Sequence, residues 1–227
     1  MPDSYGTILP SVLQGLTTTV SAAAGGIALT IVLAFAAGLA MVSPSRVVRV
    51  ISRVYVEVFR GTSEVVQLFW LYFVLPALVG FKLVPLFAGI LVLGLNHGAY
   101  GAEIVRGAVN SIPRAQYEGA VALNLSPAQR MWRVLLPQAV VDTLPPFTNL
   151  FIQLLKSTAL LSFISAGDIT EHGELLRPVF GRDIVWIYGT ELVLYLLLAL
   201  VIKYGMRVLE HAGARRLGRR PARIAGV

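Results

Sequence analysis

The sequence predicts an all-α integral membrane protein with about five transmembrane helices, because its composition is strongly apolar and its apolar residues fall into long blocks. It is 56% hydrophobic and 14% charged, against about 45–50% and about 25% in soluble domains. Residues 20–42 carry no charge, and a helix crosses the hydrocarbon with roughly 20 apolar residues. We therefore expect a single transmembrane domain over residues 1–227.

Four more apolar blocks follow the first, and we detect no internal repeat. The five expected spans cover residues 20–42, 65–80, 83–102, 142–164 and 184–206. Residues 1–15 lack a basic region leading into an apolar stretch, so we expect no cleaved signal peptide and assign membrane targeting to the first helix.

The basic residues alternate between the two sides of these spans. Those between the first and second spans, between the third and fourth spans, and from the end of the fifth span onward are Arg46, Arg49, Arg53, Arg60, Arg106, Arg114, Arg130, Arg133, Lys203, Arg207, Arg215, Arg216, Arg219, Arg220 and Arg223. Because Lys and Arg in short loops mark the cytoplasmic side, we expect the C-terminus inside and the N-terminus outside. The Arg-rich tail, residues 215–223, is interpreted as an orientation signal that contacts membrane lipid, not nucleic acid.

The long segment between the third and fourth spans, residues 103–141, carries helix start and stop signals. Pro113 suits the first turn of a helix, and Asn124 tolerates the left-handed conformation that ends one. Ser126 and Gln129 have the spacing of a capping box, which starts a second helix. Pro137 is expected to end or kink that helix. Two short helices are therefore predicted, which either contact another protein or lie on lipid as an amphipathic hairpin.

Seven residues of this segment share the spacing of a known motif. They are Glu118, Gly119, Ala120, Asn124, Val134, Leu136 and Pro137. They resemble the EAA loop of ATP-binding-cassette importer permeases, in which the pattern is E-A-A, three residues, G, nine residues, I, one residue, L-P. Gly119, Asn124 and Val134 depart from that pattern, and Gly119 weakens a helix by roughly 0.5–1 kcal/mol relative to Ala.

The resemblance extends over about residues 15–206. Residues 56–76, 96–113 and 136–162 are similar to successive blocks of the polar amino acid permease family. Within it, the segments VYVEVFRGTS, ALNLSP and TALLSFISAGDIT most resemble permeases for ectoine and hydroxyectoine. The resemblance implies a permease domain in the bacterial cytoplasmic membrane that imports amino acids or related zwitterions.

The resemblance also implies partners. Two permeases, a heterodimer being favoured over a homodimer, would assemble with two ATPase subunits and receive solute from an extracytoplasmic binding protein. Residues 118–124 would form the coupling helix that sits in a groove of the ATPase. None of the lysines, Lys82, Lys156 and Lys203, lies in a phosphate-binding loop. We therefore expect no enzymatic activity and no cofactor on this chain, with ATP and Mg bound by the partner ATPase.

Polar groups within the apolar blocks are costly in lipid and are candidates for a substrate path. They are Asn96, Tyr100, Glu103 and Lys156. A zwitterionic solute needs partners for both of its charges. The favoured alternative is that these side chains pair between helices, for example Lys156 with Glu103. Gly94 and Gly98, four residues apart, are assigned to close helix packing.

Two other function classes remain alternatives. An ion-coupled secondary transporter usually contains inverted repeats and midplane ionisable groups, whereas this chain offers Lys156 as its one deeply placed charge. A membrane enzyme or an assembly scaffold is the other. An enzyme needs clustered catalytic or metal-binding groups, but His97, His172 and His211 are scattered and there is no cysteine. No catalytic or metal-binding residue is predicted.

Overall fold

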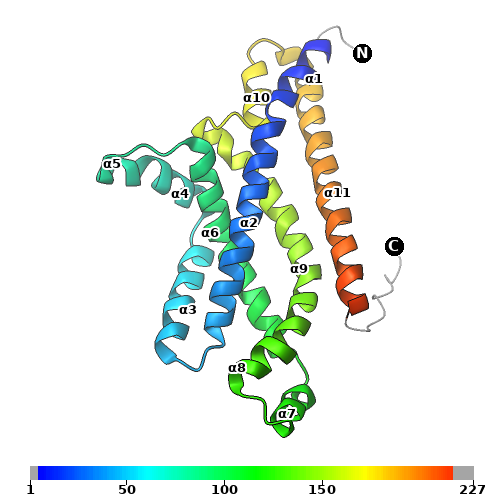
Figure 1. Ribbon diagram of the computed structural model, residues 1–227. Coiled ribbons are helices and arrows are strands. Elements are labelled where there is room, and N and C mark those ends of the chain that lie inside the picture. The colour runs from blue at the N-terminus through cyan, green and yellow to red at the C-terminus, as the bar shows by residue number, and fades with distance from the viewer. Residues whose placement is uncertain (1–4, 217–227) are drawn as a thin grey trace.

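The computed structural model describes residues 5–216, and all regular structure in that range is helical. Its long helices run side by side along one axis (Figure 1). Three helical segments are long and apolar enough to cross a membrane: Gly6–Met41, Pro127–Ile164 and Gly181–Arg216. A fourth is present if Arg46–Gly61 and Glu64–Val79, which meet at 104°, form one span. The all-α membrane class predicted from composition is confirmed.

The centre of the bundle is the pair α2 (Leu16–Met41) and α6 (Pro85–Asn110), each of 26 residues. α6 matches the expected third span but continues to Asn110. It differs from the three segments above in burying the polar side chains Asn96 and His97 within its length. Because of these polar residues, α6 does not count among the apolar segments. The structure therefore contains three or four such segments where the sequence predicts five spans.

Small residues allow α2 and α6 to approach closely. A Cβ on Gly101 would lie 2.6 Å from the Cβ of Ala34, and one on Gly98 would lie 2.8 Å from the Cβ of Leu33. A Cβ on Gly94 would lie 2.5 Å from Leu29 Cδ2. Real Cβ atoms do not approach so closely, so these positions require glycine. The packing role expected for Gly94 and Gly98 is confirmed.

The expected second span is not a straight crossing helix. It consists of α4 (Glu64–Phe69), a π-helical turn η1 (Trp70–Val74) and α5 (Leu75–Val79), and it projects sideways from the bundle (Figure 1). The basic segment before it, expected as a loop, is the helix α3 (Arg46–Gly61), which packs on α2 and α6. Extended backbone at Thr62 and Ser63 separates α3 from α4. The membrane span that the sequence assigns to one helix is therefore shared between α3 and the α4–α5 segment.

Two prolines follow π-helical turns. Pro76 comes after η1, and Pro137 comes after η2 (Arg130–Leu135), which continues the short α8 (Pro127–Gln129). Proline lacks an N–H and clashes with the carbonyl four residues earlier, and the wider π turn accommodates that clash. The helical segment therefore continues through Pro137 to Ile164. Of the two expectations for Pro137, an end of the second loop helix is therefore wrong, and a kink stays a prediction.

The remaining elements complete the bundle. α9 (Leu136–Ser157) and the 3₁₀ helix η3 (Thr158–Ile164) form the fourth expected span. α1 (Tyr5–Gln14) packs against α10 (Ile169–Leu176). The short η4 (Gly181–Asp183) leads into α11 (Ile184–Arg216), which extends ten residues beyond the expected end of the fifth span. Of the predicted Arg-rich tail, Arg219, Arg220 and Arg223 lie outside the described residues.

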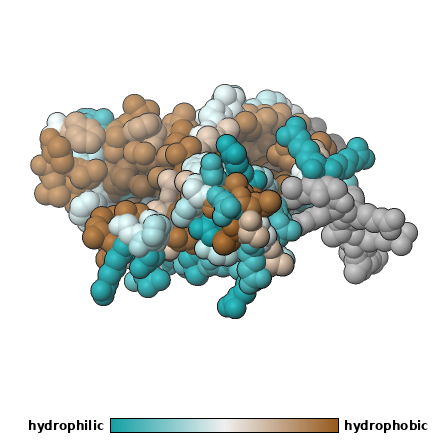
Figure 2. Space-filling view, turned by 60° about the horizontal axis from the view of Figure 1, so that its bottom comes forward, coloured by the Kyte–Doolittle hydropathy of each residue, from teal (hydrophilic) through white to brown (hydrophobic). Residues whose placement is uncertain are grey.

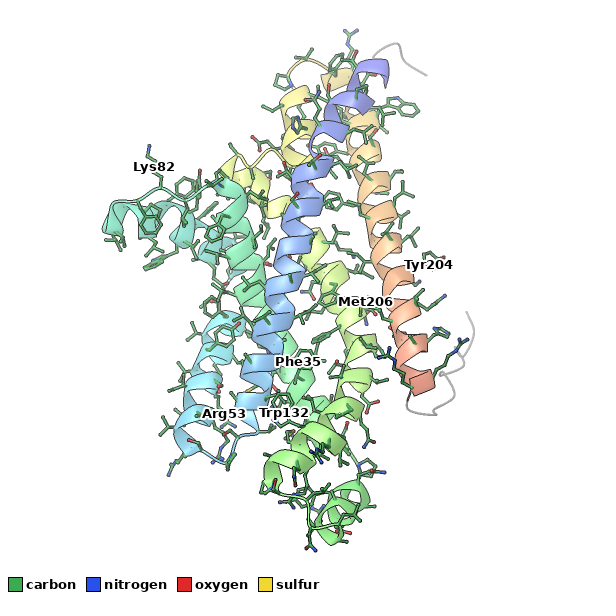
Figure 3. The ribbon with its side chains drawn as sticks, in the orientation of Figure 1. Phe35, Arg53, Lys82, Trp132, Tyr204 and Met206 are labelled. Carbon is green, nitrogen blue, oxygen red and sulfur yellow. The ribbon has the colours of Figure 1, made fainter. Side chains whose placement is uncertain are left out.

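The surface has the pattern of a membrane protein. Hydrophobic surface occupies much of the flank, while hydrophilic side chains project from the end that comes forward (Figure 2). Arg53 and Trp132 lie at this end of the bundle, and Lys82 extends from the opposite half (Figure 3). The outward side chains of α3 include the exposed aliphatic residues Val47 and Ile51. Lipid accounts for so much exposed apolar surface.

Gly38 provides a test of the α2–α6 contact. A Cβ at this position would lie 2.7 Å from the carbonyl oxygen of Ala102 and 2.7 Å from Val105 Cβ. Gly38→Ala should therefore lower the midpoint of thermal unfolding in detergent, at a cost of about 1–3 kcal/mol for overpacking. Gly205→Ala is the control, because nothing lies within 4 Å of its added Cβ. Equal midpoints for both variants would contradict tight packing.

Candidate functional site

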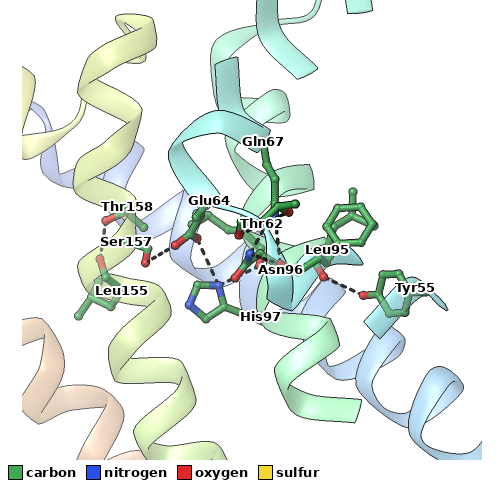
Figure 4. A network of polar contacts seen from close by, with 12 residues as sticks. Tyr55, Thr62, Glu64, Gln67, Leu95, Asn96, His97, Leu155, Ser157 and Thr158 are labelled. Carbon is green, nitrogen blue, oxygen red and sulfur yellow. Dashed lines mark hydrogen bonds and ion pairs between the residues drawn. The ribbon is translucent and has the colours of Figure 1, made fainter. Parts of the chain in front are cut away.

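Two regions of the structure are candidates for function. The first is the end loop, residues 111–135, which joins α6 to α9 at one end of the bundle. The second is the polar cluster between α3, α4, α6 and α9 (Figure 4). Its members are Tyr55, Thr62, Glu64, Gln67, Asn96, His97 and Ser157.

The end loop begins with α7 (Arg114–Ala122). Glu118 and Gly119 are exposed on this helix, and Ala120 is buried. Asn124, two residues after the helix ends, has a φ of +54°, which is left-handed as predicted. Leu125 N donates to Ala120 O at 3.1 Å, which closes the turn in the way typical of helix C-termini. The exposed face of α7 thus carries the first two residues of the EAA-like motif.

The second part of the end loop is capped as predicted. Gln129 N donates to Ser126 Oγ at 3.3 Å, and Ser126 N donates to Gln129 Oε1 at 2.9 Å, so both halves of the capping box are present. Leu136 is half-buried and Pro137 is exposed at the start of α9. Two short helices joined by a tight turn are therefore confirmed.

Two contacts attach α7 to the helix that leads into the bundle. The guanidinium of Arg130 lies 4.6 Å from the centroid of the Tyr117 ring, a cation–π contact. Gln138 Nε2 donates to Gln116 Oε1 at 3.4 Å. Because α8, η2 and α9 form one helical segment, α7 is joined to a rod that runs into the membrane-spanning part of the protein.

In the polar cluster, Asn96 is only 5% exposed and is tied to the break between α3 and α4. Its Nδ2 donates to Phe59 O at 2.9 Å and to Gln67 Oε1 at 3.2 Å. Gln67 Nε2 in turn donates to Phe59 O and to Thr62 Oγ1. These amides satisfy carbonyls that the end of α3 would otherwise leave without partners. Asn96 therefore has a structural role.

Glu64, His97 and Ser157 bring three helices together. Ser157 Oγ donates to Glu64 Oε2 at 3.0 Å, and His97 Nδ1 lies 3.5 Å from Glu64 Oε1 and 3.1 Å from Leu93 O. Within residues 5–216, Glu64 Oε1 and His97 Nε2 are buried and have no hydrogen-bond partner. Sequence analysis did not identify this group, because Glu64, His97 and Ser157 lie far apart in the chain and share no motif spacing.

Of the other predicted path residues, the structure brings Tyr100 and Glu103 together around Arg60 and leaves Lys156 outside this group. Glu103 pairs with Arg106 Nη2 at 2.6 Å and with Arg60 Nη1 at 3.6 Å. Arg60 also lies 5.0 Å from the centroid of the Tyr100 ring. Lys156 is exposed on α9 beside Ser157 and forms no ion pair within residues 5–216. The suggested pair of Lys156 with Glu103 is therefore wrong.

The opposite end of the bundle has its own charged group. Tyr188 Oη donates to Glu174 Oε1 at 2.7 Å, and Arg177 forms an ion pair with the same carboxylate. These hydrogen bonds hold the pKa of the Glu174 carboxyl below its usual value. Among the described residues, no three His, Asp or Glu side chains are arranged to hold a metal ion.

Long apolar helices, buried polar groups between them and a folded loop at one end define a multi-pass helical membrane protein. The chain belongs to the family of binding-protein-dependent transport system inner membrane components, whose model matches residues 26–215. It is accordingly a permease component of the cytoplasmic membrane and not a catalytic subunit.

Curated relatives agree with this assignment. The probable amino-acid ABC transporter permease protein y4tF of Sinorhizobium fredii is 45% identical over 194 residues, covering 83% of this chain and 81% of the relative. The glutamine transport system permease protein GlnP of Escherichia coli K12 is 34% identical over 204 residues, covering 89% and 92%. A solved amino acid ABC transporter with histidines superposes with a TM-score of 0.81 at 26% identity, covering 89% and 94%.

The role of Asn96 can be measured. Asn96→Ala removes one of the two side-chain donors to Phe59 O and leaves Gln67 Oε1 without this partner, which should cost about 1–3 kcal/mol. The thermal midpoint in detergent should fall by about 2–4 °C for each kcal/mol lost. Asn110→Ala, at the exposed end of α6, is the control and should change little. A midpoint unaffected by Asn96→Ala would rule out its structural role.

Proposed function

We propose that this chain is the permease subunit of an ATP-binding-cassette importer for amino acids or related zwitterions, driven by ATP hydrolysis on separate subunits. The observation that carries the proposal is the end loop, in which the EAA-like motif forms a capped, rigid element with Glu118 exposed. The names of the curated relatives, which are transport permeases for amino acids or glutamine, support the substrate class.

The contacts of the end loop suggest how coupling works. Glu118, Gly119 and Ala120 sit on α7, Asn124 forms the turn, and Leu136 and Pro137 begin α9. A force on α7 is passed to Arg130 through Tyr117 and to Gln138 through Gln116. From there one helical segment runs to Ile164 and carries Lys156 and Ser157 on its way. Movement of an ATPase groove around α7 would thus reach the polar cluster mechanically.

The distribution of charge supports an orientation. Arg49 lines a cavity together with Tyr117 and Pro127 of the end loop, and Arg46 and Arg53 line an adjoining hollow. Lys82 lies in the other half of the molecule (Figure 3). By the positive-inside rule, the end loop and the C-terminus face the cytoplasm and the N-terminus faces outward. Two ATPase subunits that bind ATP and Mg would then attach at the end loop. A solute-binding protein would attach at the opposite side, and a second permease, preferably a paralogue, would complete the path.

We place the substrate path beside Lys156. Its ammonium group is exposed next to Ser157, whose hydroxyl contacts Glu64. A cation and a carboxylate at neighbouring positions suit the carboxylate and the cationic group of a zwitterion. Asn96, Tyr100 and Glu103 instead support the helices around the path, because each already has a partner within the chain.

Ectoine or hydroxyectoine remains a narrower proposal based on the segments that resemble those permeases. The relatives reported above favour the broader amino-acid class. Stimulation of ATP hydrolysis by the loaded binding protein, measured with ectoine, glutamine, arginine and histidine, distinguishes these substrates. Family membership favours an importer over an ion-coupled secondary transporter or a scaffold, since the family is one of binding-protein-dependent transport systems.

The coupling proposal predicts the effect of one charge reversal. Glu118→Lys should leave the protein inserted and folded, because Glu118 is exposed on α7. It should reduce the ATPase subunit retained on copurification and lower solute uptake at least tenfold, by placing a like charge or a clash at the contact. Glu174→Lys, at the other end of the bundle, should retain the ATPase subunit. Equal retention by both variants would contradict coupling through α7.

The path proposal predicts a separation of transport from stability. Lys156→Met should raise the solute concentration for half-maximal uptake roughly tenfold, the loss of one charge-assisted contact of about 1.5 kcal/mol. The thermal midpoint should not change, because Lys156 is exposed and forms no ion pair within residues 5–216.

The matched control for this measurement is Lys203→Met, an exposed lysine on α11, which should leave uptake unchanged. If Lys156→Met instead lowers the thermal midpoint while the concentration dependence of uptake stays the same, Lys156 is a packing residue.

A further inference from the structure

A cavity of about 690 Å³ opens between the α2–α3 turn and the end loop. Its walls are mostly apolar and include Leu39, Val42, Met131 and Leu135. The charged residues that line it, Arg49 and Arg130, are both basic. We propose that this cavity binds an anionic phospholipid of the cytoplasmic leaflet, with the phosphate on the two arginines and the first acyl carbons along the apolar wall.

The positive charge around the cavity is not neutralised by the chain. Arg49 also lines a smaller adjoining hollow of about 240 Å³ with Arg46 and Arg53. Within residues 5–216, no carboxylate oxygen lies within 4.0 Å of the side-chain nitrogens of Arg46, Arg49, Arg53 or Arg130. Four guanidinium groups without acidic partners attract an external anion, and guanidinium binds phosphate through paired N–H groups.

Both arginines that line the cavity are held in place. Arg49 Nη1 donates to Ser43 O at 2.7 Å and to Pro44 O at 3.0 Å, which fixes its guanidinium across the α2–α3 turn. Arg130 is stacked over Tyr117. Guanidinium carries five N–H donors, so each group keeps donors for a ligand. Pre-positioned side chains lose little entropy on binding.

The position of the cavity selects a lipid over a soluble anion. The apolar helix α2 ends at Met41, just before the turn that lines the cavity. Trp132, which also lines it, is 64% exposed, and tryptophan is enriched at membrane interfaces. Arg53 and Trp132 lie at the same end of the bundle (Figure 3). A free phosphate would leave the apolar wall uncovered, whereas a phospholipid covers it and matches the charge.

A bound lipid would span two parts of the protein. One wall belongs to the α2–α3 turn, and the other contains Tyr117 of α7 and Pro127 of α8. The lipid would therefore brace the end loop against the transmembrane helices. An effect on coupling rests on the function proposed above, but binding itself does not, so the two can fail separately.

Fluorescence quenching of Trp132 tests the proposal in the full-length protein, copurified with its partner subunits and reconstituted in nanodiscs. Trp70→Phe and Trp186→Phe leave Trp132 as the single tryptophan of this chain. Phosphatidylglycerol brominated near the glycerol should quench Trp132 at a mole fraction roughly tenfold lower than brominated phosphatidylcholine. Millimolar inorganic phosphate should not reverse the quenching, because it covers none of the apolar wall.

The double variant Arg49→Gln/Arg130→Gln should remove the preference for phosphatidylglycerol. Arg114→Gln/Arg133→Gln, which changes two exposed arginines of the end loop outside the cavity, should retain it. If the first double variant does not fold, Arg130→Gln alone should still weaken the preference several-fold, since Arg49 keeps its contacts to the turn.

Three results would overturn the proposal. Equal quenching by the two lipids would mean that the cavity does not select anionic headgroups. Reversal of quenching by inorganic phosphate would make it a site for soluble anions. Absence of quenching by either brominated lipid, with no lipid retained in native mass spectra of the complex, would mean that a protein contact and not a lipid fills the cavity.

Discussion

The close contact between α2 and α6 is the constraint on which the rest of the structure depends. In lipid, apolar side chains gain nothing by turning from the bilayer to a neighbouring helix, so packing must hold helices together. Glycines at 38, 94, 98 and 101 provide that packing, because each lets its backbone lie directly against backbone or side chains of the facing helix. α3, α4 and α9 all pack against α6, so the positions of the polar cluster and the end loop follow from this pair.

The second organising feature is the use of polar groups where the helices are interrupted. Extended backbone at Thr62 and Ser63 would leave carbonyls unsatisfied in the membrane, where each costs several kcal/mol. Asn96 on α6 and Gln67 on α4 both donate to Phe59 O, and Gln67 also donates to Thr62 O. The carboxylate of Glu64, at the first position of α4, then lies against His97 and Ser157. The interruption between α3 and α4 thus lets the Glu64 carboxyl join α4, α6 and α9.

Turns and helix caps could be predicted from the sequence, whereas contacts between residues far apart in the chain could not. The turn at Asn124 and the capping box of Ser126 and Gln129 depend on residues within a few positions of one another, and both form as expected. α3 was missed because its arginines resemble a basic loop, although they recur at helical spacing among exposed valines. The contact of Glu64 with His97 arises from tertiary packing. The pairing of Glu103 with Arg60 likewise could not be chosen over Lys156 without knowing which faces meet.

The π turn before Pro137 also sets an angle. A π turn holds one residue more than an α turn, so it shifts the rotational phase of a helix by about 100°. The π turn η2 therefore sets the direction in which the Lys156 face of α9 points relative to α7. If η2 had one residue fewer, that face would be rotated by about a quarter turn. The number of residues between Ser126 and Pro137 is therefore a structural requirement in its own right. An insertion or a deletion there would turn the face of α9 that bears Lys156 away from α7.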